Sequence, residues 1–457
     1  MRTLTRSFAL TAGVALAAAV VLPAQAAKPE PRIITAPHAT VTTDNETPVL
    51  FDDEAGGNAS GDDPAIWVDP KRSDNSLVIV TAKEGGLRVY DMRNREIQSL
   101  GATAFPADGR YNNVDIAYGL KVGSRRVDVA AVSDRYNDTV RFFAIDPAGA
   151  KAATPLREIT ASGYQWLFVT SQAELEEEHT AYGLAVYQPT RGKDKGKTFV
   201  VVTREGNTTL AVAQVLPKAD GTVALGTPRL ITMPRTFTLP DGSSWFPCEE
   251  PGVDPQFEGV TVDQRTGTLY AAQEDVGLWR VELEKRSAKP VLIDTVKDFG
   301  VPDVFDADED ECVVAGPDKG FGGKYIEADA EGVDIWYGPG ANGYVVLSSQ
   351  GNDTFVVYDR KGSNKVVGTF SVAGIKGADE INGSDGLAIT NRPVGRFRQG
   401  LLVTHDEPET WSGMTEAEED RDPTNFSYVS WGEVAKALKL KTHGAAGSKA
   451  GNDPRFR

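Results

Sequence analysis

The chain has 457 residues and a formal net charge of −17, with 65 acidic residues against 48 basic ones. A field of that sign repels nucleic acid and anionic membrane surfaces, so we expect neither as a partner, and it favours the binding of cations. The many short apolar runs and 46 glycines are typical of a single all-β closed domain.

The first 26 residues have the features of a secretory signal peptide. Two arginines precede an apolar stretch over residues 8–21, and residues 24–26 offer a small-residue cleavage site. No later stretch is apolar for long enough to cross a bilayer. We therefore expect a secreted, extracellular protein, and loss of the two arginines takes its net charge from −17 to −19.

A short pattern then returns six times along the chain. Each unit begins with an acidic or polar residue, the strand start, which glycine often follows. An apolar strand, a turn and a second apolar strand come next, and the second strand ends on charged or polar residues, the strand tip. The strand starts are Asp62 (DDPAIWVDP), Asn113 (NVDIAYG), Tyr182 (YGLAVYQ), Glu258 (EGVTVDQ), Glu331 (EGVDIWYG) and Asp385 (DGLAITN). The strand tips are Lys83-Glu84, Asp134-Arg135, Arg204-Glu205, Glu274-Asp275, Gln350-Gly351-Asn352 and His405-Asp406. A third apolar strand follows in five units, at 87–91, 140–146, 210–215, 278–283 and 355–360.

Six such units predict an all-β fold, a six-bladed β-propeller of antiparallel four-stranded blades. Successive strands of a meander run antiparallel, so the strand start and the strand tip share one edge of each blade. In a radial arrangement both sets converge on the same end of the central channel. Around the propeller, over 51–440, we expect a lead-in segment, 27–50, that is mobile or adds an edge strand, and a frayed tail, 441–457.

Cys248 and Cys312 are the two cysteines, and both lie in insertions around the fourth and fifth repeats. In an exported chain a single disulfide is the expected state, although the sequence leaves open whether the two residues approach each other. The alternative, a reactive cysteine, finds no support in a Cys-x5-Arg loop around either residue.

Carboxylates gather at the predicted mouth of the channel. Close like charges either take up protons or bind cations, and many hard oxygen ligands favour calcium. The strand starts, the strand tips and their neighbours supply Asp62, Asp63, Asp115, Glu258, Glu274, Asp329, Glu331, Asp385 and Asp406.

Three cations, Lys83, Arg135 and Arg204, occupy the tips of consecutive units, with Tyr182 beside them. A mouth divided between acids and cations fits a metal-bridged polyanion, whose other phosphates Lys and Arg would hold. Structural alternatives stay open for each residue. An acid before glycine is often only a turn residue, a lone cation is often solvated, and a tyrosine can be a core aromatic.

Several chemistries find no motif in this sequence. The four histidines form no H-E-x-x-H pair, no Arg-His-Gly motif and no Ser-His-Asp set, and no Walker loop, Rossmann fingerprint or zinc spacing occurs. These absences argue against histidine-based phosphoryl transfer and zinc hydrolysis. His405 is the one histidine near a strand tip, and we interpret it as a supporting or bystander residue.

At these residues the chain resembles a known family, the β-propeller phytases, also called alkaline or calcium-dependent phytases. The resemblance runs through all six repeats and covers nearly the whole mature chain. The segments that carry it are DDPAIWVDP (62–70), NNVDIAYG (112–119), AYGLAVY (181–187), FEGVTVD (257–263), AAQEDVGLW (271–279), DAEGVDIWY (329–337), SSQGNDTFVVYDR (348–360) and SDGLAI (384–389).

The resemblance implies a monomeric phosphoric monoester hydrolase, a 3-phytase, that uses several calcium ions (Ca2+). It would hydrolyse myo-inositol hexakisphosphate (phytate), a small-molecule substrate taken as calcium-phytate, by attack of a metal-activated water. By position, the catalytic calcium ligands would be Asp62, Glu258, Glu274, Asp329, Glu331 and Asp385, and the phosphate-binding residues Lys83, Arg135, Tyr182 and Arg204. Asp63 and Asp406 match ligands of a further, structural calcium.

The chain departs from the family pattern at two points. Glu84 and Arg204 stand where some members have lysine, and the inserts at about 236–256 and 298–328 are longer. The inserts therefore bear on the site rim and on specificity. Two alternatives are a calcium-dependent lactonase or esterase, which would need few basic residues at its site, and a non-catalytic extracellular binding propeller.

Overall fold

The computed structural model describes residues 36–103, 108–163, 165–442 and 453–456. The chain divides into two compact units, Met1–Ile33 and Ile34–Arg457, and every described residue belongs to the second. The signal peptide predicted over residues 1–26 therefore lies outside the described residues.

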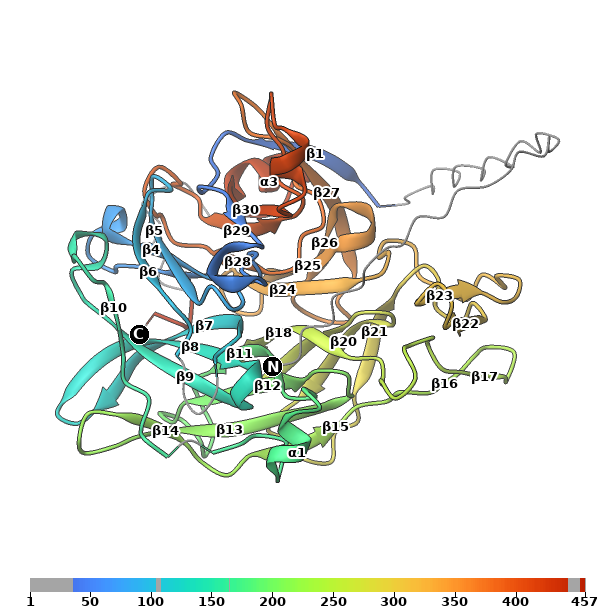
Figure 1. The fold of residues 1–457 in the computed structure, drawn as a ribbon, viewed down its shortest axis with the longest axis horizontal. Helices are drawn as coiled ribbons and strands as arrows, with labels where there is room; N and C mark the ends of the chain where they lie inside the picture. Colours follow the sequence, from blue (N-terminus) through green and yellow to red (C-terminus); the bar gives the residue numbers. More distant parts are fainter. Residues whose placement is uncertain (1–35, 104–107, 164, 443–452, 457) are drawn as a thin grey trace, which may run out of the picture. The chain divides into compact units, whose positions relative to one another are not determined.

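Six antiparallel sheets are arranged radially around a central channel, which confirms the predicted six-bladed β-propeller (Figure 1). Blade 1 consists of β3 (Pro64–Trp67), β4 (Leu77–Thr81), β5 (Leu87–Asp91) and β6 (Glu96–Leu100). Blade 2 consists of β7 (Tyr111–Val122), β8 (Arg125–Asp134), β9 (Thr139–Ile145) and β10 (Leu156–Glu158). Blade 3 consists of β11 (Ala181–Tyr187), β12 (Phe199–Arg204), β13 (Thr209–Pro217), and β14 (Val223–Leu225) with β15 (Arg229–Thr232), both of which pair with β13.

The second half of the ring repeats this plan. Blade 4 consists of β18 (Phe257–Asp263), β19 (Thr268–Gln273), β20 (Gly277–Glu282) and β21 (Val291–Thr295). Blade 5 consists of β24 (Ala330–Tyr337), β25 (Gly343–Ser349), β26 (Thr354–Asp359), β27 (Val366–Gly374) and β1 (His38–Thr43). Blade 6 consists of β28 (Leu387–Thr390), β29 (Leu401–Asp406), β30 (Pro423–Ser430) and β2 (Leu50–Phe51). The helices are short: α1 (Gln172–Leu175), α2 (Glu416–Glu419) and α3 (Trp431–Ala437).

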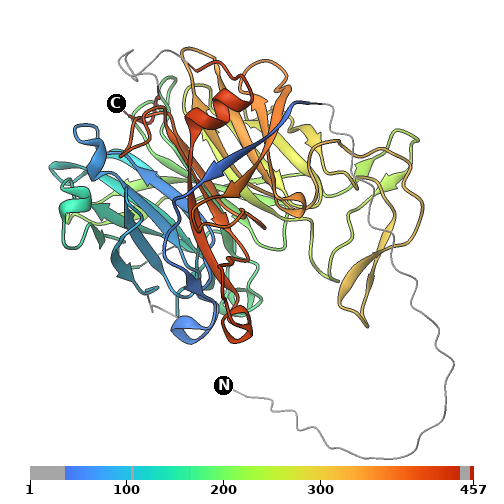
Figure 2. The same ribbon diagram turned by 90° about the horizontal axis from the view of Figure 1, so that it is seen from above.

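The ring is closed by the lead-in segment. Strand β2 pairs antiparallel with β30 and so supplies the outer strand of the last blade from residues that precede the first blade. Strand β1 adds a parallel edge to β27 of blade 5 (Figure 2). Of the two alternatives for residues 27–50, the described part therefore adds edge strands.

The second strand of each blade is buried on both faces because the neighbouring blades cover it. In β4, Val78 and Val80 pack into a core with blade 6, while Leu77 and Ile79 pack into a core with blade 2. Side chains of a strand alternate between its faces, so one apolar run feeds both cores between the blades. This is why the repeats show continuous apolar runs where an exposed sheet would alternate.

Two hairpins protrude beside blade 4, and a disulfide joins the loops that carry them. Strands β16 (Phe237–Thr238) and β17 (Ser244–Trp245) form one hairpin, and β22 (Asp303–Asp306) and β23 (Glu311–Val314) form the other (Figure 1). The bond links Cys248 to Cys312 with their Cα atoms 6.0 Å apart, which confirms the predicted disulfide.

The expectation of a frayed tail is wrong for residues 453–456. Asp453 is 1% exposed, and Arg455 forms an ion pair with Asp334 of blade 5. The sequence could not predict this burial, because the tail is polar and the buried partners of its charged residues lie far away in the sequence.

Candidate active site

Four of the inner strands begin with a β-bulge, and the bulge carries the residue that faces the channel mouth. The strand register shifts between Tyr111 and Val114 in blade 2, and at the matching positions of blades 3, 4 and 5. A bulge bends the strand and re-aims a side chain. The residues in these bulges are Asn112-Asn113, Tyr182-Gly183, Glu258-Gly259 and Glu331-Gly332. The second strand start is therefore Asn112, one residue before the predicted Asn113.

Glycine follows the strand start because adjacent blades meet backbone to backbone here. A Cβ atom on Gly183 would lie 1.8 Å from the carbonyl oxygen of Glu258, and one on Gly259 would lie 2.1 Å from that of Glu331. A Cβ atom on Gly332 would likewise lie 2.5 Å from the carbonyl oxygen of Asp385. Since real Cβ atoms do not approach this closely, the glycines let the inner ring close and bring the strand starts together.

Three buried glutamates, Glu258, Glu274 and Glu331, form the centre of the site. Each offers a carboxylate oxygen within 4.8 Å of the others, and they are 6%, 8% and 4% exposed. Asn112 Nδ2 donates to Glu258 Oε1 at 2.9 Å, and Gln256 Nε2 donates to Glu274 Oε2 at 2.8 Å. Within the described residues, Glu274 Oε1 and Glu331 Oε2 are buried without a hydrogen-bond partner.

Burial and mutual repulsion shift the pKa values of this set upwards. Burial, followed by the charge of Glu258, raises the pKa of Asp62 well above its ordinary value. Burial and Glu274 do the same for Glu331, while burial and Glu258 raise the pKa of Asp329. A cluster with these properties is stable when protonated or when it binds cations.

Asp385 is held at the edge of the cluster by two neighbours. Gln350 Nε2 donates to Asp385 Oδ1 at 2.5 Å, and Nδ1 of His405 lies 3.3 Å from Asp385 Oδ2. His405 is fully buried, and burial lowers its pKa to about 3, so the imidazole is neutral. Its Nε2 lies 3.9 Å from Glu407, which completes an Asp385, His405 and Glu407 group that the sequence analysis did not assign.

Two of the three predicted cations lie beside the carboxylates. Burial lowers the pKa of Lys83, but the charges of Asp62 and Asp385 outweigh it and raise the pKa overall. Arg135 Nη1 donates to Asn112 Oδ1 at 3.3 Å, and its Cζ lies 4.9 Å from the centre of the Tyr182 ring. Tyr182 therefore contacts a predicted phosphate-binding cation at the mouth.

The third cation has different contacts. Arg204 Nε donates to the carbonyl oxygen of His179 at 2.8 Å, and Arg204 lies 5.8 Å from the Phe168 ring centre. Sequence reasoning missed Arg110. Burial lowers the pKa of Arg135, the charge of Arg110 lowers it further, and Arg110 Nη1 lies 3.9 Å from Glu84 Oε1. Its position two residues before the strand start Asn112 was the available signal.

Another set of carboxylates lies deeper in the channel and joins neighbouring blades. Asp63 Oδ2 accepts the backbone N–H of Val114 at 2.9 Å, and Asp115 Oδ2 accepts that of Val186 at 2.7 Å. In blade 1, Asp63 thus occupies the position that glycine holds in blades 3 to 6, and its side chain reaches the backbone of blade 2. The structure does not place Asp63 with Asp406.

Asp406 belongs to a separate acidic group at the edge of blades 5 and 6. Glu46, Asp379, Asp406 and Glu409 offer oxygens within 4.8 Å of one another. Asp406 is fully buried, and its Oδ2 has no hydrogen-bond partner in the described part of the chain. Burial raises the pKa of Glu46 to about 7 and that of Glu409 to about 9. Of these four residues the sequence predicted only Asp406, because the others lie outside the repeat pattern.

The disulfide-bonded insert reaches the rim of the site. Glu249 follows Cys248 and lies beside Asp275, and burial raises the pKa of Glu249 to about 9 and that of Asp275 to about 7. Both carboxyl groups interact with Asp329 of the cluster. The insert therefore adds a carboxylate next to the predicted ligands.

The sequence matches the phytase family model over residues 7–211 and 249–445. It is 27% identical over 406 residues to the 3-phytase of Bacillus subtilis (strain 168), which covers 88% of this chain and 86% of that protein.

Among solved structures, BBS1N in complex with ARL6DN aligns with a TM-score of 0.39 and 11% identity, over 86% of this chain and 94% of that one. Virginiamycin B lyase from Staphylococcus aureus aligns with a TM-score of 0.35 and 11% identity, over 84% and 98%. The family model spans the strand starts and strand tips of all six blades, and the chain accordingly belongs to the phytase family, as a β-propeller phytase.

Proposed function

We propose that this phytase is a calcium-dependent 3-phytase that removes phosphate from phytate. The observation that carries the proposal is the group of three buried glutamates, two of whose oxygens have no partner among the described residues. Lys83 lies near Asp62 and Asp385, and Arg135 lies near Asp62 and Glu258. A buried, unneutralised acidic cluster beside cations is suited to a metal-bridged polyanion.

The residues fit calcium. The cluster offers only carboxylate and amide oxygens near Glu258, and calcium takes six to eight oxygen ligands in flexible geometry. The proposed ligands of the catalytic ions are Asp62, Glu258, Glu274, Asp329, Glu331 and Asp385. When bound there, calcium supplies positive charge to phosphate oxygens and lowers the pKa of water.

The other residues have distinct tasks. Lys83 and Arg135 bind and orient the phosphates and offset their negative charge as it shifts during phosphoryl transfer. Tyr182 supports the guanidinium of Arg135, and Asn112 holds Glu258 in place. Arg204, the remaining predicted phosphate ligand, would bind an adjacent phosphate of the ring after release from the His179 carbonyl.

We assign a structural calcium to Glu46, Asp379, Asp406 and Glu409. The buried oxygen of Asp406 that lacks a hydrogen-bond partner supports this assignment. The role of Asp63 as a ligand stays a prediction.

We propose further that the protein is exported as a monomer, with a signal peptide over residues 1–26 and the propeller over 51–440. The described residues include no helix that is both long and apolar enough to cross a membrane. Mass spectrometry of the protein from the medium should find an N-terminus at Ala27; intact residues 1–26 would refute export through this peptide.

The proposed activity is tested with a substrate panel. Three reactions are compared at saturating calcium: phosphate release from phytate, phosphate release from p-nitrophenyl phosphate, and cleavage of a lactone ester. We expect phytate to be the preferred substrate. Lactone cleavage without phosphate release would favour the lactonase or esterase, and tight phytate binding without turnover would favour a binding propeller.

A further inference from the structure

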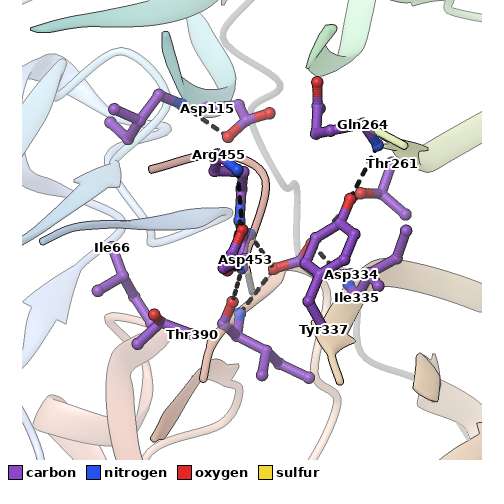
Figure 3. A network of polar contacts seen from close by, with 12 residues as sticks. Ile66, Asp115, Thr261, Gln264, Asp334, Ile335, Tyr337, Thr390, Asp453 and Arg455 are labelled. Carbon is purple, nitrogen blue, oxygen red and sulfur yellow. Dashed lines mark hydrogen bonds and ion pairs between the residues drawn. The ribbon is translucent and has the colours of Figure 1, made fainter. Parts of the chain in front are cut away.

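Residues 453–456 cross the channel at the end away from the carboxylate cluster. Strand β24 begins next to Glu331, in the cluster, and ends at Tyr337, where Arg455 lies (Figure 3). Between this segment and the strand starts remains a cavity of about 50 Å³. The family model ends at residue 445, so the segment lies beyond the residues that it matches.

Arg455 is the central contact of the segment. Its Nη2 donates to the carbonyl oxygen of Ile389 at 2.7 Å, and its Nη1 lies 3.3 Å from Asp334 Oδ2. The guanidinium carbon lies 5.2 Å from the centre of the Tyr337 ring. Arg455 thereby joins β24 of blade 5 to β28 of blade 6.

Asp453 fixes the guanidinium in this orientation. Its Oδ2 accepts from Nη2 of Arg455 at 2.8 Å, its Oδ1 accepts from Nε at 3.1 Å, and the carboxylate is 1% exposed (Figure 3). A bidentate pair of this kind is geometrically specific. Pro454 between the two residues restricts the backbone, so the segment is suited to present both groups together.

Phe456 extends the contact to the other side of the channel. Its ring meets Tyr118 of blade 2 edge to face, with ring centres 4.7 Å apart, and Arg392 stands over it at 5.0 Å. Four consecutive residues therefore contact blades 2, 5 and 6.

The channel at this end is rich in buried carboxylates, and Arg455 brings positive charge to them. Asp334 Oδ2 accepts the backbone N–H of Ile389 at 2.7 Å, just as Asp115 and Asp63 accept backbone groups of their neighbouring blades. Burial raises the pKa of Asp115 to about 6, and Arg455 acts against that shift. Removal of Arg455 would leave Asp334 buried without its cationic partner, which is costly.

We propose that this end of the channel is a peptide-binding site whose ligand is the chain's own Asp453–Phe456 segment, which plugs the channel and clamps blades 2, 5 and 6. The ligand class is a short peptide with an acidic residue, proline, arginine and an aromatic residue in sequence. The site is independent of the carboxylate cluster, so its failure would leave the proposed function untouched.

Two variants test the plug: a chain that ends at residue 452 lacks it, and Arg455→Met in the full chain lacks only the contacts of the guanidinium. The matched control is Arg398→Met, which alters an exposed arginine. We expect Arg455→Met to lower the melting temperature by roughly 3–6 °C in chelator and in calcium alike, the truncation by at least as much, and the control by about 1 °C or less.

Binding in trans gives the decisive measurement. A synthetic peptide of residues 452–457 should restore the melting temperature of the shortened chain in a saturable manner, and the same peptide with methionine at position 455 should not. An unchanged melting temperature on truncation, or equal rescue by both peptides, would overturn the proposal.

A double-mutant cycle covers the case in which the shortened chain does not fold. Arg455→Met and Asp334→Asn are combined in the full chain. The double variant should lose clearly less melting temperature than the sum of the losses of the two single variants, because each substitution removes the same ion pair. Additive losses would show that Arg455 does not act through Asp334 and would refute the plug.

Discussion

Replacing Glu258 with glutamine should change stability in opposite directions with and without calcium. Glu258 is 6% exposed, and its charge raises the pKa values of Asp62, Glu331 and Asp385. Glutamine keeps the volume and an oxygen that can accept the Asn112 hydrogen bond, but it removes the charge. Without calcium this relieves repulsion, and with calcium it removes a ligand.

The structure sets the size of the effect. Two unit charges at 4.8 Å, the limit that the three glutamate oxygens satisfy, repel by about 3 kcal/mol at an effective dielectric constant of 20. Partial protonation reduces this repulsion, so we expect a gain of roughly 1–3 kcal/mol in chelator at pH 8, which is a rise in melting temperature of about 1–3 °C. In calcium, each tenfold loss of affinity removes about 1.4 kcal/mol of the stabilisation by bound metal.

The assay is thermal unfolding of the wild-type chain, of Glu258→Gln and of the control Glu309→Gln, in chelator and in millimolar calcium. Glu309 is an exposed acid in the turn of the β22–β23 hairpin, so its variant should behave as wild type in both conditions. The reasoning is refuted if Glu258→Gln is destabilised in chelator, or if it keeps the calcium-induced rise in melting temperature.

Three further outcomes are expected. Arg135→Ala should lower kcat/KM for phytate roughly 10- to 100-fold through a lost charged contact, while the exposed Arg398→Ala should not; equal values for both variants would contradict the role of Arg135. In chelator the melting temperature should fall as pH rises from 5 to 9. Acids whose folded-state pKa is raised, such as Asp275 (about 7) and Glu249 (about 9), stabilise the fold only while they are protonated. A melting temperature that rises across this pH range would contradict the prediction. Asp406→Asn should weaken the calcium-dependent gain in melting temperature yet keep turnover at saturating calcium, and loss of turnover there would tie Asp406 to catalysis.

Repetition made the fold and much of the site predictable. Residues such as Glu258 and Glu331 recur at one position of a repeat, and the geometry of antiparallel strands then places them at one end of the channel. The same logic failed by one residue at Asn113, because two residues of a bulge oppose one on the partner strand and the sequence does not show which of them faces the mouth.

Residues outside the repeat could not be predicted in this way. Glu46 comes from the lead-in segment, and Glu249 is brought to the rim by the disulfide-bonded insert, so both depend on contacts between distant parts of the chain. Arg455 is the clearest case, since its partners Asp334 and Ile389 lie far away in the sequence. A polar tail looks solvated until the buried carboxylates that it meets are known.

The most direct test of the central claim is one calcium titration of the chelated protein, followed by calorimetry and by phosphate release from phytate. We expect no phosphate release without calcium and activity that rises as calcium binds to the cluster. In Glu331→Gln, both the calorimetric heat of calcium binding and the phosphate release should be lost. Phosphate release that persists in chelator, or calcium binding and turnover that survive Glu331→Gln, would contradict the claim that this buried cluster holds the catalytic ions.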